Sequence, residues 1–67
     1  MNKLEMINEL VESRFGREVR YCKNPVDSRI NLPQYRNCKY FLENILTWNI
    51  VEAFKTQKEL IEFLKNY

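Results

Sequence analysis

The sequence predicts a small α+β domain in which a helix at each end of the chain packs on a three-stranded antiparallel sheet. Apolar residues near both termini recur at helical spacing, whereas the central part is rich in aromatic and β-branched residues. A chain of 67 residues forms one domain, spanning residues 1–67, and buries only about 60% of its unfolded surface. We therefore expect marginal stability.

The first predicted element is a helix from Asn2 to Phe15. Its apolar residues fall on one face, and this face consists of Leu4, Ile7, Leu10 and Val11. Asn2 precedes Glu5 by three residues, which is the spacing of a capping box. Gly16 follows the last helical residue and suits a left-handed C-terminal cap. Leu4, Ile7 and Val11 are expected in the core.

The last predicted element is a helix from Thr56 to Tyr67. The segment TQKE begins with a hydroxyl that can accept from the Glu59 amide, while the Glu59 carboxylate reaches back toward the cap. The apolar stripe of this helix consists of Leu60, Ile61, Leu64 and Tyr67. Leu60 and Leu64 are expected in the core.

Three strands are predicted between the helices. They cover Arg17–Cys22, Cys38–Asn44 and Thr47–Phe54, and the last two form a hairpin that turns near residues 44–46. In the third strand, Trp48, Ile50 and Phe54 share one parity, so we expect all three in the core.

One alternative for residues 38–54 remains open from the sequence. Phe41, Ile45, Trp48 and Val51 also match helical spacing, which would make the protein mostly α-helical. Poor helix formers within this segment and the lack of a cap before it favour the hairpin.

The segment from Cys22 to Cys38 contains both cysteines and both prolines and has no hydrophobic period. If the first two strands pair, the cysteines would face each other across its neck. The N-terminus lacks the pattern of a signal peptide, so we expect a cytoplasmic protein with reduced thiols. A disulfide and a metal role remain alternatives. The segment is either a binding loop or a connector. The connector interpretation allows a short edge strand at residues 28–32.

The composition excludes several classes of chemistry. The sequence has no histidine and only one glycine, so His-dependent triads, most zinc sites and glycine-rich phosphate loops are absent. We expect no enzymatic activity, no cofactor and no metal. An acidic stripe formed by Glu5, Glu9 and Glu12 on the first helix is interpreted as a solvated face rather than a partner site.

The positive charge is concentrated in the centre of the chain. Residues 14–39 contain seven basic and two acidic residues, with tyrosines interleaved, although the whole chain has a net charge of only +2. The predicted binding residues are Arg17, Arg20, Arg29, Tyr35 and Arg36. We expect Arg29, Tyr35 and Arg36 to serve binding rather than folding. Arginine and tyrosine are typical anchors of protein interfaces.

Two functions and one neutral interpretation follow from this pattern. The first is a non-enzymatic protein that binds another protein. The second is a nucleic-acid-binding protein, with arginines on phosphates and tyrosines stacked on bases. In the neutral interpretation, the arginines only solubilise a small sheet. The modest net charge favours the first.

The source and assembly of the protein are also constrained. Asn, Lys and Ile supply 19 residues, whereas Ala and Gly supply one each, which suggests an AT-rich genome. A phage or mobile-element regulator or inhibitor of a host protein fits the small size and this composition.

No apolar run approaches membrane-spanning length, so no membrane partner is expected. The edges of a three-stranded sheet suggest a homodimer.

Overall fold

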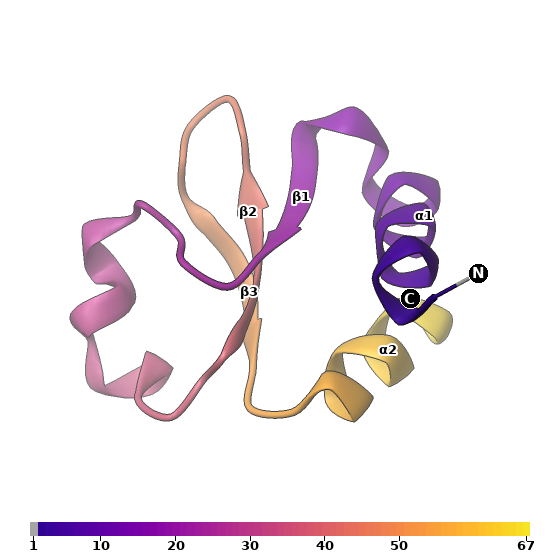
Figure 1. Ribbon diagram of the computed structural model, residues 1–67. Helices are drawn as coiled ribbons and strands as arrows, with labels where there is room; N and C mark the ends of the chain where they lie inside the picture. Colours follow the sequence, from indigo (N-terminus) through magenta and orange to yellow (C-terminus); the bar gives the residue numbers. More distant parts are fainter. Residues whose placement is uncertain (1) are drawn as a thin grey trace.

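The computed structural model describes residues 2–67 and confirms the predicted α+β fold (Figure 1). The chain begins and ends with a helix, and the residues between the helices form an antiparallel sheet with strand order β1-β2-β3. The helices and strands are α1 (Lys3–Phe15), β1 (Val19–Cys22), β2 (Tyr40–Asn44), β3 (Ile50–Phe54) and α2 (Gln57–Lys65). Residues 38–54 form a hairpin, so the helical alternative for this segment is wrong.

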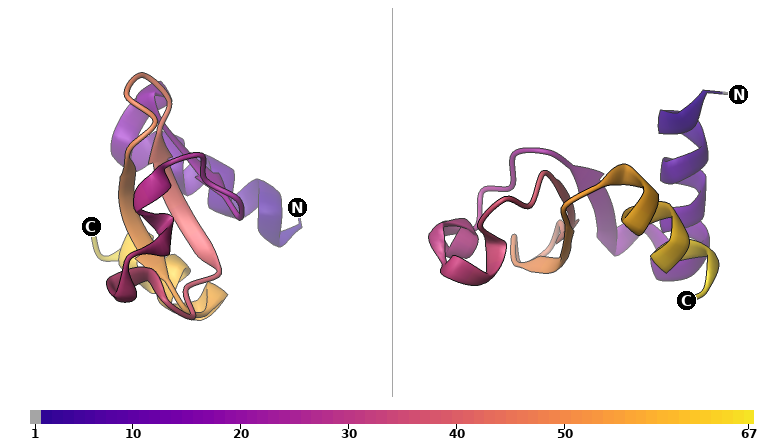
Figure 2. Two further views of the ribbon diagram at one scale, coloured as in Figure 1. Left: turned by 90° about the vertical axis from the view of Figure 1, so that its left-hand side faces the viewer. Right: turned by 90° about the horizontal axis from the view of Figure 1, so that it is seen from below.

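The elements are arranged in three layers. Both helices cover one face of the sheet, and the segment between β1 and β2 covers the other (Figures 1 and 2). This covering segment contains two short 3₁₀ helices, η2 (Ser28–Asn31) and η3 (Pro33–Tyr35). The edge strand considered for residues 28–32 is therefore wrong. We call residues 23–39 the covering segment.

Local capping signals fix the helix boundaries. The Asn2 side chain accepts a hydrogen bond from the Glu5 amide (2.8 Å), and the Thr56 hydroxyl accepts one from the Glu59 amide (3.1 Å). Gly16 has a φ of 77° and closes α1 by donating its amide to the Glu12 carbonyl. Neither helix combines the length and apolar character needed to cross a membrane within residues 2–67.

The larger core lies between the helices and the sheet. Its buried members are Ile7, Val11, Leu42, Phe54, Leu60 and Leu64. Leu4 was predicted to belong to it, but its side chain is 54% exposed. Figure 2 shows the reason, because the first turn of α1 projects past the rest of the molecule. The periodicity of α1 predicts which face of the helix packs against the core. It does not predict how many turns of the helix the core covers.

A bulge in β3 divides its apolar residues between the two faces of the sheet. Leu42 pairs with Glu52, but the next residue, Glu43, pairs with Ile50, so Val51 is an extra residue. Phe54 consequently faces the helices, whereas Ile50 faces the covering segment. Both are buried as predicted, but they do not share one face.

The hairpin turn is longer than the sequence indicated. The Asn44 side-chain oxygen accepts from the amides of Leu46 (2.8 Å) and Thr47 (3.1 Å), and its carbonyl accepts from the Trp48 amide (2.7 Å). The turn therefore covers residues 45–49, and β3 begins only at Ile50. Trp48 lies in the turn and is 48% exposed, so its predicted place in the core is wrong.

Candidate functional site

A buried carboxylate organises the sheet face beneath the covering segment. Glu43 is fully buried, and its Oε1 accepts from the Arg20 Nε (3.1 Å) and the Cys22 thiol (3.8 Å). Its Oε2 accepts from the Val26 amide (3.1 Å). The cation and the amide offset the cost of burying this charge. Glu43 thereby joins the beginning of the covering segment to β1 and β2.

A second carboxylate joins the covering segment to β3. The Asp27 side chain accepts from the Arg29 amide (2.9 Å) and from the Ile50 amide (2.9 Å). The Arg29 guanidinium binds the same carboxylate through Nε (3.0 Å) and Nη2 (2.8 Å). These bonds, above all those from the Arg29 side chain, hold the pKa of Asp27 well below its usual range. The β3 residue that Asp27 binds follows the hairpin turn directly.

The hairpin turn presents Trp48 in an unusual backbone conformation. Its φ is 63°, in the left-handed region that bulky residues rarely adopt. The Arg20 guanidinium lies over its ring, with the Arg20 Cζ 5.6 Å from the centroid. Arg20 thus contacts an exposed indole and a buried carboxylate at once. Residues in such strained conformations cluster at functional sites.

The hairpin turn and the covering segment each carry a further exposed apolar residue. Leu46 is 69% exposed in the same turn, and Val26 is 65% exposed beside the amide that Glu43 binds. A hydrogen bond from the Ile45 amide to the Glu18 carbonyl (2.8 Å) holds the turn against the start of β1. We define the hairpin-tip surface as Arg20, Val26, Leu46 and Trp48. It combines an aromatic ring, a guanidinium and exposed aliphatic groups.

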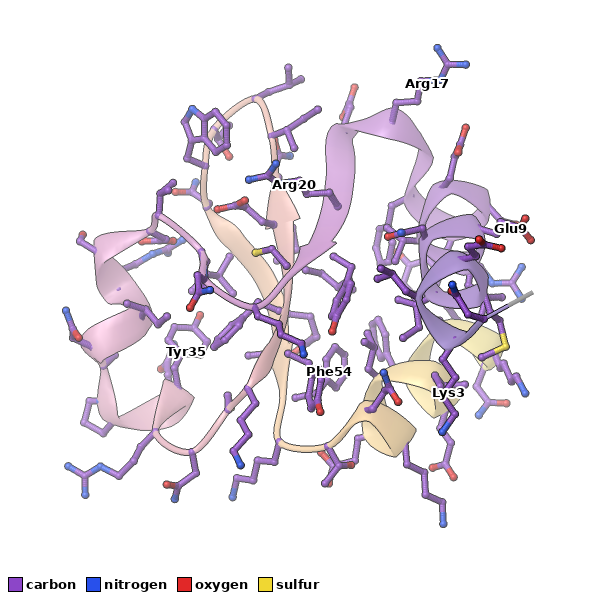
Figure 3. All side chains as sticks on the ribbon, in the orientation of Figure 1. Lys3, Glu9, Arg17, Arg20, Tyr35 and Phe54 are labelled. Atoms are coloured by element: carbon purple, nitrogen blue, oxygen red, sulfur yellow. The ribbon has the colours of Figure 1, made fainter. Side chains whose placement is uncertain are left out.

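Two of the five predicted binding residues lie at the same end of the sheet. Arg17 and Arg20 line an open hollow of about 420 Å³ between α1 and β1. The Arg17 side chain is 93% exposed and lies 3.7 Å from the Glu12 carboxylate. Figure 3 shows both guanidiniums near the hairpin end of the molecule. The structure therefore brings Arg17 and Arg20 together, and Arg20 belongs to the hairpin-tip surface.

The other three predicted residues lie on the covering segment. Tyr35 is half-buried in η3, on the opposite side of the sheet from the helices, and Arg36 is exposed directly after it (Figure 3). Arg29 is tied into the fold by its bonds to Asp27. These bonds give Arg29 a part in the fold, and its role in binding stays a prediction. The binding roles of Tyr35 and Arg36 stay predictions as well.

Sequence reasoning missed Leu46 and Trp48 as surface residues. A signal was present, because Asn44 and Asn49 bracket the turn and asparagine favours turns. The strand propensity of the segment TWNIV outweighed this signal. Glu43 offered no comparable signal, since its partners lie 17 to 23 residues away in sequence.

The two cysteines are not bonded to each other. Cys22 pairs across the sheet with Phe41 and not with Cys38, so the predicted opposition of the cysteines is wrong. Burial and the neighbouring Glu43 carboxylate raise the pKa of the Cys22 thiol. Within residues 2–67, no group of three or more Cys, Asp or Glu side chains is placed to hold a metal ion.

Comparisons with known proteins give no relative for this chain. It matches no protein-family model, no curated protein and no solved structure. Function must therefore be inferred from the side chains themselves. Among them, the hairpin-tip surface combines exposure, strain and a fixed geometry.

Proposed function

We propose that this chain is a non-enzymatic binding protein that recognises another protein through its hairpin-tip surface. The main supporting observation is the exposed Trp48 ring, held at a positive φ beneath the Arg20 guanidinium. Tryptophan and arginine are the residues most enriched among interface hot spots. An exposed indole contributes little to the core, so its presence in a strained turn favours a role at the surface.

The surface is also prepared for binding before a partner arrives. The Arg20 guanidinium is fixed by its hydrogen bond to the Glu43 carboxylate. The turn that carries Trp48 is fixed by the hydrogen bonds that the Asn44 side chain accepts. Side chains that are already ordered lose less conformational entropy on association. Tyr35 and Arg36 extend the candidate interface along the covering segment. A regulator or inhibitor from a phage or mobile element, acting on a host protein in the cytoplasm, fits this design.

Other observations support a binding role over catalysis. The two most buried carboxylates, Glu43 and Asp27, are both occupied by structural hydrogen bonds. The sequence has no histidine to act as a base near neutral pH.

Nucleic acid is the second candidate partner, because an exposed indole beside arginines can stack on an unpaired base. The charge arrangement disfavours it. Arg17, Arg20 and Arg29 each lie within 3.7 Å of a carboxylate, which reduces the positive charge left for phosphates. Nucleic-acid binding would weaken steeply as salt rises, whereas an interface centred on Trp48 and Leu46 would not.

The test is capture of partners from a nuclease-treated bacterial lysate by the parent and by Leu46→Ala and Trp48→Asn variants. Leu4→Ala is the matched control, since Leu4 is similarly exposed but lies on α1. We expect one set of partners to be lost with the turn variants and kept with Leu4→Ala. Equal capture by all folded variants would exclude the hairpin-tip surface, and loss of all capture after nuclease treatment would favour nucleic acid.

Self-association is a further part of the proposal. Strands β1 and β3 are the edges of the sheet, and Val51 in β3 is 41% exposed. Pairing of edges through a two-fold axis would bury additional apolar surface in a small domain. Sedimentation equilibrium should show a dimer at high concentration. A monomer at every concentration tested would contradict this.

A further inference from the structure

Three lysines lie at the end of the sheet opposite the hairpin turn. At this end the chain leaves β1, enters β2 and leaves β3, because neighbouring strands are antiparallel (Figure 1). Each strand has a lysine directly beyond its end here: Lys23 follows β1, Lys39 precedes β2 and Lys55 follows β3. We call these three residues the lysine patch. The proposed hairpin-tip function does not use it.

Contacts within the fold bring the three lysines together. The Lys39 amide donates to the Phe54 carbonyl (2.9 Å), so Lys39 lies beside the end of β3 and the adjoining Lys55. The Lys23 Nζ lies 5.8 Å from the centroid of the Tyr40 ring, which packs against the core. Neighbouring strands are about 4.8 Å apart, so the backbone positions of the patch span about 10 Å. All three lysines are exposed.

The fold does not neutralise the charge of the lysine patch. Residues 28–42 and 53–58 contain no aspartate or glutamate. Within residues 2–67, no lysine nitrogen lies within ion-pairing distance of a carboxylate, whereas three of the five arginines have such a partner. Glu59 is close in sequence, but its carboxylate accepts from the Lys55 backbone amide (3.4 Å) at the cap of α2.

The placement of these lysines does not stabilise the fold. Lys39 and Lys55 lie on neighbouring segments, and like charges that face each other across a sheet repel. Lys55 also directly precedes the cap of α2, at the positive end of the helix dipole, where a cation is unfavourable. A bound anion would relieve both repulsions, so the charge is better suited to binding than to folding.

We propose that the lysine patch binds a short acidic segment of a partner protein. Carboxylates of such a segment would supply the counter-charge that the fold itself does not provide. The patch is also short along the chain, because Glu52 and Glu59 lie on either side of Lys55. A short acidic segment therefore fits it better than the extended phosphate backbone of a nucleic acid.

The aromatic residues near the patch also disfavour nucleic acid. The rings of Tyr21 and Tyr40 stack on each other, with centroids 6.3 Å apart and planes at 17°, and both pack against the core. They are therefore not free to stack on an unpaired base.

The proposal is tested by fluorescence anisotropy with the full chain at low salt. The probe is labelled hexaglutamate, a glycine–serine hexapeptide is the neutral control, and hexathymidylate is the nucleic-acid probe. We expect saturable binding of hexaglutamate that weakens as salt rises, and no binding of the neutral peptide. Absence of saturable hexaglutamate binding would mean that the lysines only solubilise the sheet and would overturn the proposal. Tighter binding of hexathymidylate would also overturn it and would assign the patch to nucleic acid.

Matched variants locate the interaction. Lys55→Gln should weaken hexaglutamate binding about two- to fivefold, and Lys39→Gln in addition should weaken it further. Lys55→Arg keeps the charge and should bind as the parent does. Lys65→Gln is the control, because Lys65 is an exposed lysine in the last turn of α2.

Stability measurements separate a loss of binding from a loss of fold. Because Lys55 is placed unfavourably for folding, Lys55→Gln should melt no lower than the parent while it binds hexaglutamate more weakly. Equal losses of binding in Lys55→Gln and Lys65→Gln would show a response to net charge alone. That result would overturn the proposal, as would unchanged binding in the variant that lacks both Lys39 and Lys55.

Discussion

The carboxylate of Asp27 accepts a hydrogen bond from the backbone amide of Ile50, 2.9 Å away and 23 residues later in the sequence. The bulge at Val51 begins directly after this amide. The same carboxylate caps η2 and pairs with Arg29. One side chain therefore connects the covering segment to the strand that follows the hairpin turn, and its ionisation affects both.

The first prediction concerns acid stability. The pKa of Asp27 is lowered in the folded state, mainly by Arg29, so its ionised form stabilises the fold above the unfolded pKa of about 3.9. This stabilisation should disappear as the pH falls below that value toward the lower folded pKa. The free energy of unfolding, measured with urea at several pH values between neutral pH and pH 2, should show this loss.

The Asp27→Asn variant is the control for this effect. It should be less stable than the parent at neutral pH and should lose less stability on acidification. If the difference in unfolding free energy between parent and variant stays constant from neutral to acidic pH, Asp27 does not contribute as described.

The second prediction compares two arginines with different partners. Arg20 pairs with the fully buried Glu43, so Arg20→Ala leaves a buried charge without its cation and should cost about 2 kcal/mol. Arg17 pairs with an exposed Glu12, so Arg17→Ala should cost less than about 0.5 kcal/mol. Equilibrium denaturation measures both.

A double variant separates charge from packing in this comparison. Arg20→Ala combined with Glu43→Gln removes the unpaired charge and keeps an acceptor for the Val26 amide. It should be destabilised by less than the sum of the two single variants. Strict additivity would mean that Arg20 and Glu43 do not interact energetically.

The third prediction concerns Trp48. Because its ring is exposed and its φ is positive, Trp48→Asn relieves backbone strain while it removes the contact with Arg20. The two effects oppose each other, and the stability should change by less than about 1 kcal/mol. Thermal unfolding by circular dichroism gives the result. A loss of several kcal/mol would show that the indole belongs to the core after all.

The fourth prediction concerns the start of α2. The Thr56 hydroxyl accepts from the Glu59 amide at 3.1 Å, so Thr56→Ala should cost about 1 kcal/mol. Thr56→Ser keeps the acceptor and should remain close to the parent. Equal losses in the two variants would point to the methyl group of Thr56 rather than to its hydroxyl.

The features predicted correctly from the sequence are those set by neighbouring residues. Both helix caps depend on residues three positions apart, and the buried stripe of each helix follows its own periodicity. Trp48 was misplaced because Asn44 holds a five-residue turn, which strand parity does not reveal. The partners of Glu43 and Asp27 could not be predicted, because they depend on how the covering segment folds back across the sheet.

The three-layer arrangement also implies that the two sides of the sheet open with different free energies. The helices are held by a cluster of six buried apolar residues, whereas the covering segment has two short 3₁₀ helices with no buried residues of their own. Its attachment combines the hydrogen bonds of the two carboxylates with packing over Phe41 and Ile50. Native-state hydrogen exchange should therefore release amides of residues 28–38 through a local opening, while those of β2 exchange only with global unfolding. The protein would behave as a stable helix–sheet unit whose covering segment opens independently of it.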